Sequence, residues 1–362
     1  MKRLALLLGS LLVVTAAASA KEVVPAPVVV EEAPVQIVEK EVIVYRDKEE
    51  GFRPNGFVDL QYKYMTDTEG KQGEWNSTNN YSRTQFQGAI NMTENQTFEF
   101  RVRDYNSLDH NPEKAGSFGN GTDTRLRYYY RHGVVGDSKV DMTSFVEYRK
   151  RGDKASQAQK VEYQLKFDFA DYMFNNDFVK TTEFTVGPRY IYSWDASNDT
   201  AYTNSLGFYV NFVNELPYGF STQLEIDGLH YNMYGKNAEV NDGPNDKKDD
   251  SFSANVGLYL YHNANLYTNG AYSLDWYFEG GYDTYDWSNR DSVTYGTPVS
   301  YEDSAYSLYA QPNLILSYQA TEFVNVYTQL GAEYRNWNKT AKSEAQDWRW
   351  QPYVAVGFRT TF

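Results

Sequence analysis

The 362-residue sequence predicts an all-β protein, a transmembrane antiparallel up-and-down β-barrel of about 14 strands with short periplasmic turns and longer outer loops. Three observations predict it. Apolar and polar residues alternate in segments of about ten residues, as strands with one face toward lipid require. The gaps between these segments alternate between short and long. The chain contains 33 Tyr and 7 Trp, which are enriched at membrane–water interfaces.

The N-terminal residues precede the predicted barrel and differ from it in composition. Residues 1–20 combine a basic start, a short apolar core and Ala18-Ser19-Ala20, which is the pattern of a signal peptide with its cleavage site. Residues 21–53 contain Pro25, Pro27 and Pro34 with many Val and Glu. This composition predicts an extended or disordered periplasmic lead-in, with a short helix or strand around Ile37–Tyr45 left open. The barrel is expected over residues 54–362.

Fourteen alternating segments follow one another through the predicted barrel. In each, one set of alternate residues is apolar or aromatic, and the other set is polar, charged or small. An even number of strands is typical of bacterial single-chain barrels. The segments cover residues 58–64, 83–90, 98–103, 125–131, 140–149, 160–169, 183–192, 205–212, 220–227, 252–260, 274–283, 308–318, 324–335 and 348–362.

Gap length follows strand parity. Short gaps come after even segments, and mostly longer polar gaps come after odd segments, as short periplasmic turns and long outer loops predict. A β-sandwich has no reason to sort its connections in this way. The short gaps include 93–96, 133–138, 215–219 and 319–322, with a further turn expected at 262–270, and the long ones are 67–80, 108–123, 234–250 and 286–303.

The last segment, Trp348–Phe362, is the expected closing strand of the barrel. One of its faces is apolar and ends on an aromatic residue, which resembles the C-terminal signal by which bacterial barrels engage the barrel-assembly machinery. The first segment must be its partner, because closure removes both sheet edges from lipid. Pro352 cannot donate a ladder hydrogen bond, so a bulge or unpaired position is expected there. The predicted signal residues are Val354, Val356, Phe358 and Phe362.

Composition excludes several classes of function. The chain has no Cys, so it has no disulfide framework, thiol nucleophile or lipoprotein anchor. Cleavage after residue 20 would remove Lys2 and Arg3, which changes the formal charge from −14 to −16. An acidic balance argues against nucleic acid as a partner. Beyond the N-terminus no apolar run is long enough for a transmembrane helix.

Charge on the predicted inner face is distributed unevenly along the chain. Bases concentrate early and acids concentrate late, and the fourth strand of a fourteen-stranded barrel lies opposite the eleventh. A transverse field across the interior would follow; the alternative is that the charges are solvated or pair with one another. The basic wall is predicted to consist of Arg83, Arg101, Arg103, Arg125, Arg127, Arg131, Arg349 and Arg359. The acidic wall is predicted to consist of Glu225, Asp227, Asp275, Glu279 and Asp283.

No catalytic residues, metal ligands or cofactor site are predicted. The four histidines are scattered and show no metal-ligand spacing. A barrel phospholipase would need a Ser–His pair on the lipid face, and the sequence suggests none. The acidic outer loop containing Asp242, Asp246, Asp249 and Asp250 could hold a divalent cation, or it could simply be solvated.

Several stretches resemble the major outer-membrane porin family of fusobacteria. They are VIVYRDKE (Val42–Glu49), RPNGFVDLQY (Arg53–Tyr62), FDFADYMFNNDF (Phe167–Phe178), EGGYDTYDW (Glu279–Trp287) and WRWQPYVAVGFRTTF (Trp348–Phe362). The resemblance implies a homotrimeric general-diffusion porin among the lipids of the bacterial outer membrane, which passes small hydrophilic solutes. It also implies adhesion roles for the outer loops, where the match is poorest.

Two alternative functions stay open beside a diffusion channel. A sugar-selective channel would line its interior with an aromatic track, and Tyr129, Tyr327 and Tyr353 are predicted to face inward without forming an evident ladder. A surface adhesin would use the barrel only as an anchor, although the predicted loops are modest in length for that role.

Overall fold

A computed structural model gives the fold of the chain. The predicted signal peptide and nearly all of the predicted lead-in lie outside the residues that it describes. The described residues are 51–68, 80–107, 121–153, 158–195, 198–235, 239–241, 247–289, 292–295, 297–300, 308–339 and 345–362.

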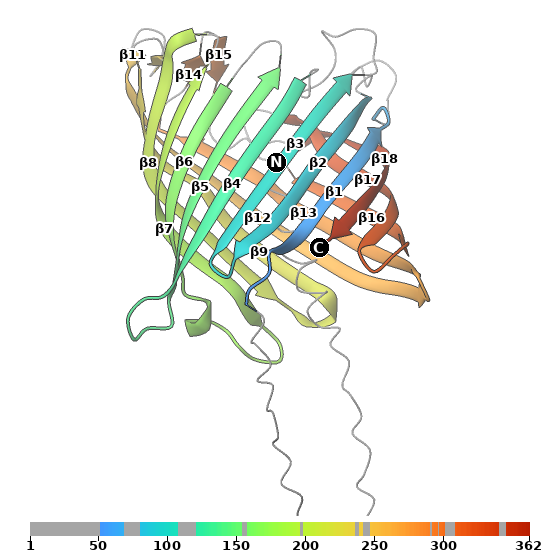
Figure 1. The fold of residues 1–362 in the computed structure, drawn as a ribbon. Helices are drawn as coiled ribbons and strands as arrows, with labels where there is room; N and C mark the ends of the chain where they lie inside the picture. Colours follow the sequence, from blue (N-terminus) through green and yellow to red (C-terminus); the bar gives the residue numbers. More distant parts are fainter. Residues whose placement is uncertain are drawn as a thin grey trace, which may run out of the picture. The chain divides into compact units, whose positions relative to one another are not determined.

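Fourteen antiparallel strands form a closed barrel (Figure 1), which confirms the predicted fold class. Each strand pairs with its neighbours along the chain, apart from the outer-loop strands described below, and β18 pairs with β1. The barrel strands are β1 (Asn55–Met65), β2 (Tyr81–Thr93), β3 (Gln96–Ser107), β4 (Gly121–Val134), β5 (Asp141–Asp153), β6 (Ala158–Asp168), β7 (Lys180–Asp195), β8 (Asn198–Glu215), β9 (Phe220–Tyr234), β12 (Asp250–Asn269), β13 (Tyr272–Ser288), β16 (Leu308–Gln319), β17 (Val324–Lys339) and β18 (Ala345–Thr361).

The closing seam joins β1 to β18, as the sequence predicted. Its register runs from Phe57 opposite Thr361 to Met65 opposite Tyr353. Beyond the strand, the backbone amide of Phe362 donates to the Gly56 carbonyl at 3.1 Å. The seam leaves the barrel without an edge strand, so each of its fourteen strands has a neighbour on both sides.

Of the two alternatives expected at Pro352, a bulge or an unpaired position, the bulge is wrong. The pairing of β17 with β18 passes through Ala332 opposite Pro352 without a shift of register. The Pro352 carbonyl accepts from the backbone amide of Thr66 at 3.0 Å, just past the end of β1. A residue in an antiparallel ladder directs its N–H and C=O to the same side. The missing N–H therefore faces the end of β1, and the ladder with β17 is intact.

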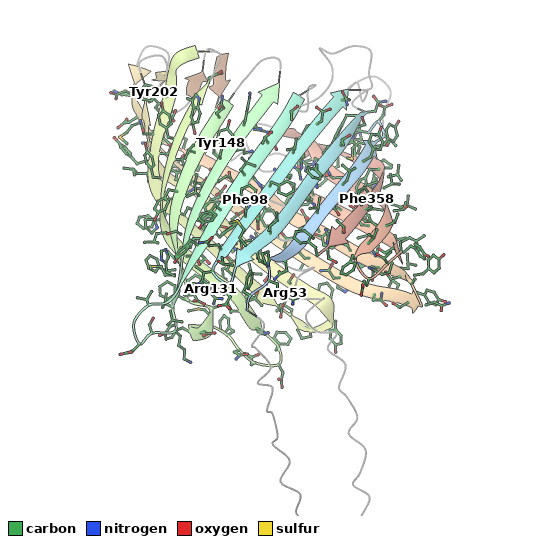
Figure 2. The ribbon with its side chains drawn as sticks, viewed as in Figure 1. Arg53, Phe98, Arg131, Tyr148, Tyr202 and Phe358 are labelled. Carbon is green, nitrogen blue, oxygen red and sulfur yellow. The ribbon has the colours of Figure 1, made fainter. Side chains whose placement is uncertain are left out.

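The two faces of each strand differ as the alternation predicted. On β18, Val356 and Phe358 are 49% and 44% exposed, whereas the intervening Ala355 is 1% exposed. Figure 2 shows Phe98 and Phe358 on the outside of the barrel. Val354 and Phe362 also point outward and are exposed. An apolar exterior and a polar interior are what a barrel in lipid requires.

Connections of different length lie at the two ends of the barrel. The short-turn end carries two single-turn helices, η1 (Ala170–Tyr172) and η2 (Pro217–Gly219). The turn predicted at residues 262–270 is largely strand, because β12 continues to Asn269, which pairs with Tyr272. The turn itself needs only Gly270, with φ +57°, and Ala271. Within the described residues, no helix is long and apolar enough to cross a membrane.

Two outer connections that the sequence predicted to be loops contain a small second sheet. Its strand order is β11 (Lys247–Lys248), β10 (Glu239–Asn241), β14 (Ser292–Tyr295) and β15 (Thr297–Ser300). Val240 of the connection between β9 and β12 pairs with Val293 of the connection between β13 and β16. The two connections are therefore joined by backbone hydrogen bonds, which polar loop composition alone did not indicate.

Candidate functional site

Charged side chains are concentrated on the inward face of the barrel. This inward face is the candidate functional site. The period of two along each strand directs the predicted basic residues inward, and their neighbours in the register decide what they contact. Arg131 is an exception. Its side chain is 59% exposed, lies near the short-turn end (Figure 2), and bonds to Asp141 at 2.5 Å. Arg131 is therefore not part of a central wall.

An ion-pair chain runs along the inner wall of the barrel from β3 to β9. Carboxylates and cations alternate along it, so each cation lies between two carboxylates. Glu147 shows the pattern, with Arg127 Nε at 2.6 Å and Lys160 Nζ at 3.0 Å. The members in order are Glu99, Arg127, Glu147, Lys160, Glu162, Arg189 and Asp227.

The ion-pair chain corrects the predicted division into a basic and an acidic wall. Alternation along β3, β5 and β6 places Glu99, Glu147 and Glu162 on the inward face, but the predicted walls did not include them. Asp227, expected on the acidic wall, instead accepts from Arg189 Nη1 at 2.6 Å. The reason is register, because Glu147 lies directly opposite Arg127 in the pairing of β4 with β5.

A basic cluster lies next to the ion-pair chain on β2 to β5. It contains five arginines and one carboxylate, that of Asp123, which contacts two of them. Arg101 Nη2 lies 3.2 Å from Asp123 Oδ2, and Arg149 Nε lies 3.1 Å from Asp123 Oδ1. The basic cluster consists of Arg83, Arg101, Arg103, Arg125, Arg149 and Asp123.

Two residues of the predicted acidic wall, Glu225 on β9 and Glu279 on β13, are buried and accept hydrogen bonds from tyrosines. Glu279 is 1% exposed and accepts from the Tyr277 and Tyr309 hydroxyls at 2.9 and 2.7 Å. Glu225 accepts from the Tyr209 hydroxyl at 3.3 Å. The strand order places β13 seven strands from β4 in either direction, so the two are opposite, as expected.

The remaining members of the predicted walls have separate surroundings. Asp275 accepts from Asn265 Nδ2 at 2.7 Å, and the side chain of Asp283 lies outside those described. Arg349 Nη1 donates to the Trp348 carbonyl at 2.8 Å. Arg359 Nε bonds to Asp59 Oδ2 at 3.3 Å, so a carboxylate offsets the charge that Arg359 was expected to add at the seam.

The barrel has more inward tyrosines than the three that the sequence predicted. The three predicted ones face inward: Tyr129 donates to Glu99 at 3.3 Å, Tyr327 donates to Asp59 at 3.1 Å, and Lys63 Nζ lies 3.3 Å from the centroid of the Tyr353 ring. The alternation along β12 could have predicted two more, because Tyr259 lies between the outward residues Leu258 and Leu260, and Tyr261 follows Leu260. Further buried inward tyrosines are Tyr209, Tyr259, Tyr261, Tyr277 and Tyr309.

The lipid-facing surface carries a Ser–His contact that the sequence did not suggest. His132 Nε2 lies 2.8 Å from Ser144 Oγ, which lies 3.3 Å from the Tyr163 hydroxyl. A nucleophilic serine also needs its histidine oriented by a third group. Among the described residues no side chain bonds to the other ring nitrogen of His132, so this contact does not complete a triad.

The described residues contain no group of three or more His, Cys, Asp or Glu side chains that could hold a metal ion. Two residues of the acidic outer loop, Asp242 and Asp246, lie outside the described part of the chain.

Closed antiparallel barrels with an apolar exterior and a charged interior belong to the bacterial outer membrane. The chain is an outer-membrane protein.

Comparison with known proteins gives likeness of fold alone. No family model and no curated protein sequence matches this chain. A bacterial polysaccharide outer membrane secretin matches at 10% identity and TM-score 0.36, over 85% of this chain and 98% of that one. The outer membrane channel DcaP of Acinetobacter baumannii matches at 10% and 0.35, over 86% and 96%. OmpF of Salmonella typhi matches at 13% and 0.32, over 86% and 98%.

Proposed function

We propose that the protein is a general-diffusion porin, a water-filled channel that passes small hydrophilic solutes and ions by size and by the electrostatics of its interior. The observation that carries the proposal is a closed barrel of fourteen strands whose inward face is lined by charged side chains. Charged groups in this number require water or counterions around them. Barrels of about 16 strands enclose an aqueous channel, whereas about eight are filled by side chains.

Passage through such a channel is passive. A hydrated solute crosses if it fits, because inward charges and hydroxyls replace part of its hydration shell. An apolar solute gains nothing from these groups and must displace ordered water. No covalent step and no cofactor are involved.

We also propose that the interior field is transverse, directed from the basic cluster toward Glu279 and Asp275 on β13. The opposition of β4 and β13 in the strand order supports this direction. The ion-pair chain contributes little to the field, because its four carboxylates and three cations nearly cancel. The basic cluster is therefore its main positive source.

Assembly is part of the proposal. The resemblance to the fusobacterial porin family supports a homotrimer, with residues 1–20 removed as a signal peptide. The outward row on β18 supports recognition by the barrel-assembly machinery, because these side chains are exposed beside the seam. That row is Val354, Val356, Phe358 and Phe362.

Planar-bilayer recording of the purified protein tests the proposal. A diffusion channel gives stepwise conductance that rises linearly with KCl concentration and is not blocked by neutral sugars. Saturable block by a sugar would identify a sugar-selective channel and replace the proposed mechanism. If a folded, membrane-inserted barrel gave no conductance steps, the channel proposal would be wrong. That result would favour an adhesin anchored by the barrel, whose outer connections contain the small sheet.

A further inference from the structure

We propose that Arg83, Arg103 and Arg125 form a binding site for a multiply charged oxyanion, of which inorganic phosphate is the smallest, inside the channel. This inference rests on the proposed function, since it gives a diffusion channel a preferred class of solute. Phosphate groups on larger hydrophilic molecules carry the same chemistry.

Like charges stand side by side across four strands, from Arg101 of the basic cluster to Lys160 of the ion-pair chain. Arg101 lies directly opposite Arg125, Arg125 opposite Arg149, and Arg149 opposite Lys160. Like charges directly opposite each other destabilise a sheet. The next inward row alternates instead, with Arg127 between Glu99 and Glu147. The same wall therefore contains a neutralised row beside a row with excess positive charge.

Among the described residues none of the three proposed ligands forms a salt bridge, although Arg103 lies opposite Asp123 in the register, and Glu99 and Glu147 act on Arg125 from the neighbouring row. Arg103 Nε donates to Gln85 Oε1 at 2.6 Å, and Arg83 Nη2 donates to Gln61 Oε1 at 3.1 Å. Arg83 Nε is buried and has no hydrogen-bond partner. Within the described ranges, none of Arg83, Arg103 and Arg125 has a carboxylate oxygen at salt-bridge distance, and Arg125 has no hydrogen-bond acceptor there.

The remaining two arginines of the basic cluster are held by Asp123, which both of them contact. Five guanidinium groups and one carboxylate give the basic cluster a net charge of +4. Arg103 is the diagonal neighbour of Arg83 across β2 and β3, and of Arg125 across β3 and β4. An anion bound at Arg103 would therefore lie between two further guanidinium groups, in a concentrated positive potential.

The donor geometry favours an oxyanion over chloride. A guanidinium presents its N–H groups as a planar fork that matches two oxygens of a phosphate or carboxylate. Chloride is a single point acceptor and cannot use two forks in this way. The flanking Gln61 and Gln85 are neutral, so they orient the arginines without cancelling their charge.

Two measurements test the site. In planar bilayers with constant KCl, phosphate should reduce the wild-type chloride current saturably, and in Arg103→Gln/Arg125→Gln the half-blocking concentration should rise about tenfold or more, since charge-assisted hydrogen bonds are lost. Isothermal titration of phosphate into the detergent-solubilised barrel should show binding by wild type and none by the double variant. A difference in gel mobility between unheated and heated samples shows that each variant is folded.

Matched controls separate a local site from a diffuse field. Arg131→Gln removes one charge at the exposed end and should leave phosphate binding unchanged. Lys180→Gln removes one charge from the exposed pair that Lys180 forms with Glu215, and it should also leave phosphate binding unchanged. Phosphate binding without conductance steps would overturn the channel and retain the site. Steps with no saturable phosphate effect, or equal losses in all variants, would overturn the site and retain the channel.

Discussion

At the scale of single residues, two glycines shape the packing of β17 against β18, beside the closing seam. Gly357 lies opposite Tyr327, and Gly331 lies opposite Tyr353. A Cβ at Gly357 would come 2.6 Å from the Tyr327 ring, and one at Gly331 would come 2.5 Å from the Tyr353 ring. Each inward ring therefore occupies the space of a missing side chain. This packing lets the Tyr327 hydroxyl reach Asp59, the carboxylate that also accepts from Arg359.

Replacing Gly357 by Val should weaken the barrel by about 1–3 kcal/mol, the usual cost of overpacking. The new side chain would displace the Tyr327 ring and leave Asp59 with fewer hydrogen-bond donors. Urea unfolding in detergent, followed by gel mobility, measures the effect. Gly51→Val is the matched control, because a Cβ at Gly51 meets nothing within 4 Å. Equal unfolding midpoints for the two variants would contradict this account of the seam.

At the scale of strands, the sequence carried the periodicity but not the pairing. Alternation located the fourteen strands and their inward faces, because side-chain direction depends only on position along a strand. Glu147 and Arg127 were both placed inward, yet their salt bridge depends on the register between β4 and β5. A shift of one residue would separate them. Contacts across strands were therefore the part that one sequence could not supply.

The sequence also failed where strand and loop have the same composition. Residues 262–269 extend β12, but they contain three Asn, which are typical of turns, and a register shift between Asn265 and Tyr267. The strands β10 and β14 are short and polar, and each is ordered by the other connection. Local sequence contains little information about such mutual pairing.

The pairing of the two outer connections can be tested by a disulfide, because the chain has no Cys. Val240 and Val293 are direct antiparallel partners. Their Cα separation should be about 4.5–5.5 Å, within disulfide range. Val240→Cys/Val293→Cys should oxidise to an intramolecular disulfide, seen as a change in non-reducing gel mobility.

Val299 provides the control for this disulfide, because it pairs with Val293 on the side away from Val240. The Val240→Cys/Val299→Cys pair is two strands apart, about 10 Å, beyond disulfide range. Oxidation of both pairs at the same rate would mean that the two connections are not held as the small sheet describes.

At the scale of the whole molecule, selectivity should follow the sum of charges in the interior. Neutralising Arg101, Arg125 and Arg127 together removes three positive charges, so the reversal potential in a KCl gradient should move toward cation selectivity. Asp123→Asn removes the single carboxylate of the basic cluster and should move it toward anion selectivity. Opposite shifts are expected, and they should shrink at high salt. Unchanged reversal potentials would show that these groups do not control permeation.

The seam has a consequence for the order of folding. Thirteen of the barrel's pairings join strands that are near in the chain or separated only by an outer connection, whereas β1 and β18 are joined across nearly the whole barrel sequence. Loop-closure entropy makes such distant contacts slow to form. Hairpins can therefore form early, and the ring closes only when β18 arrives. Until then the growing sheet has two open edges that could pair with other chains.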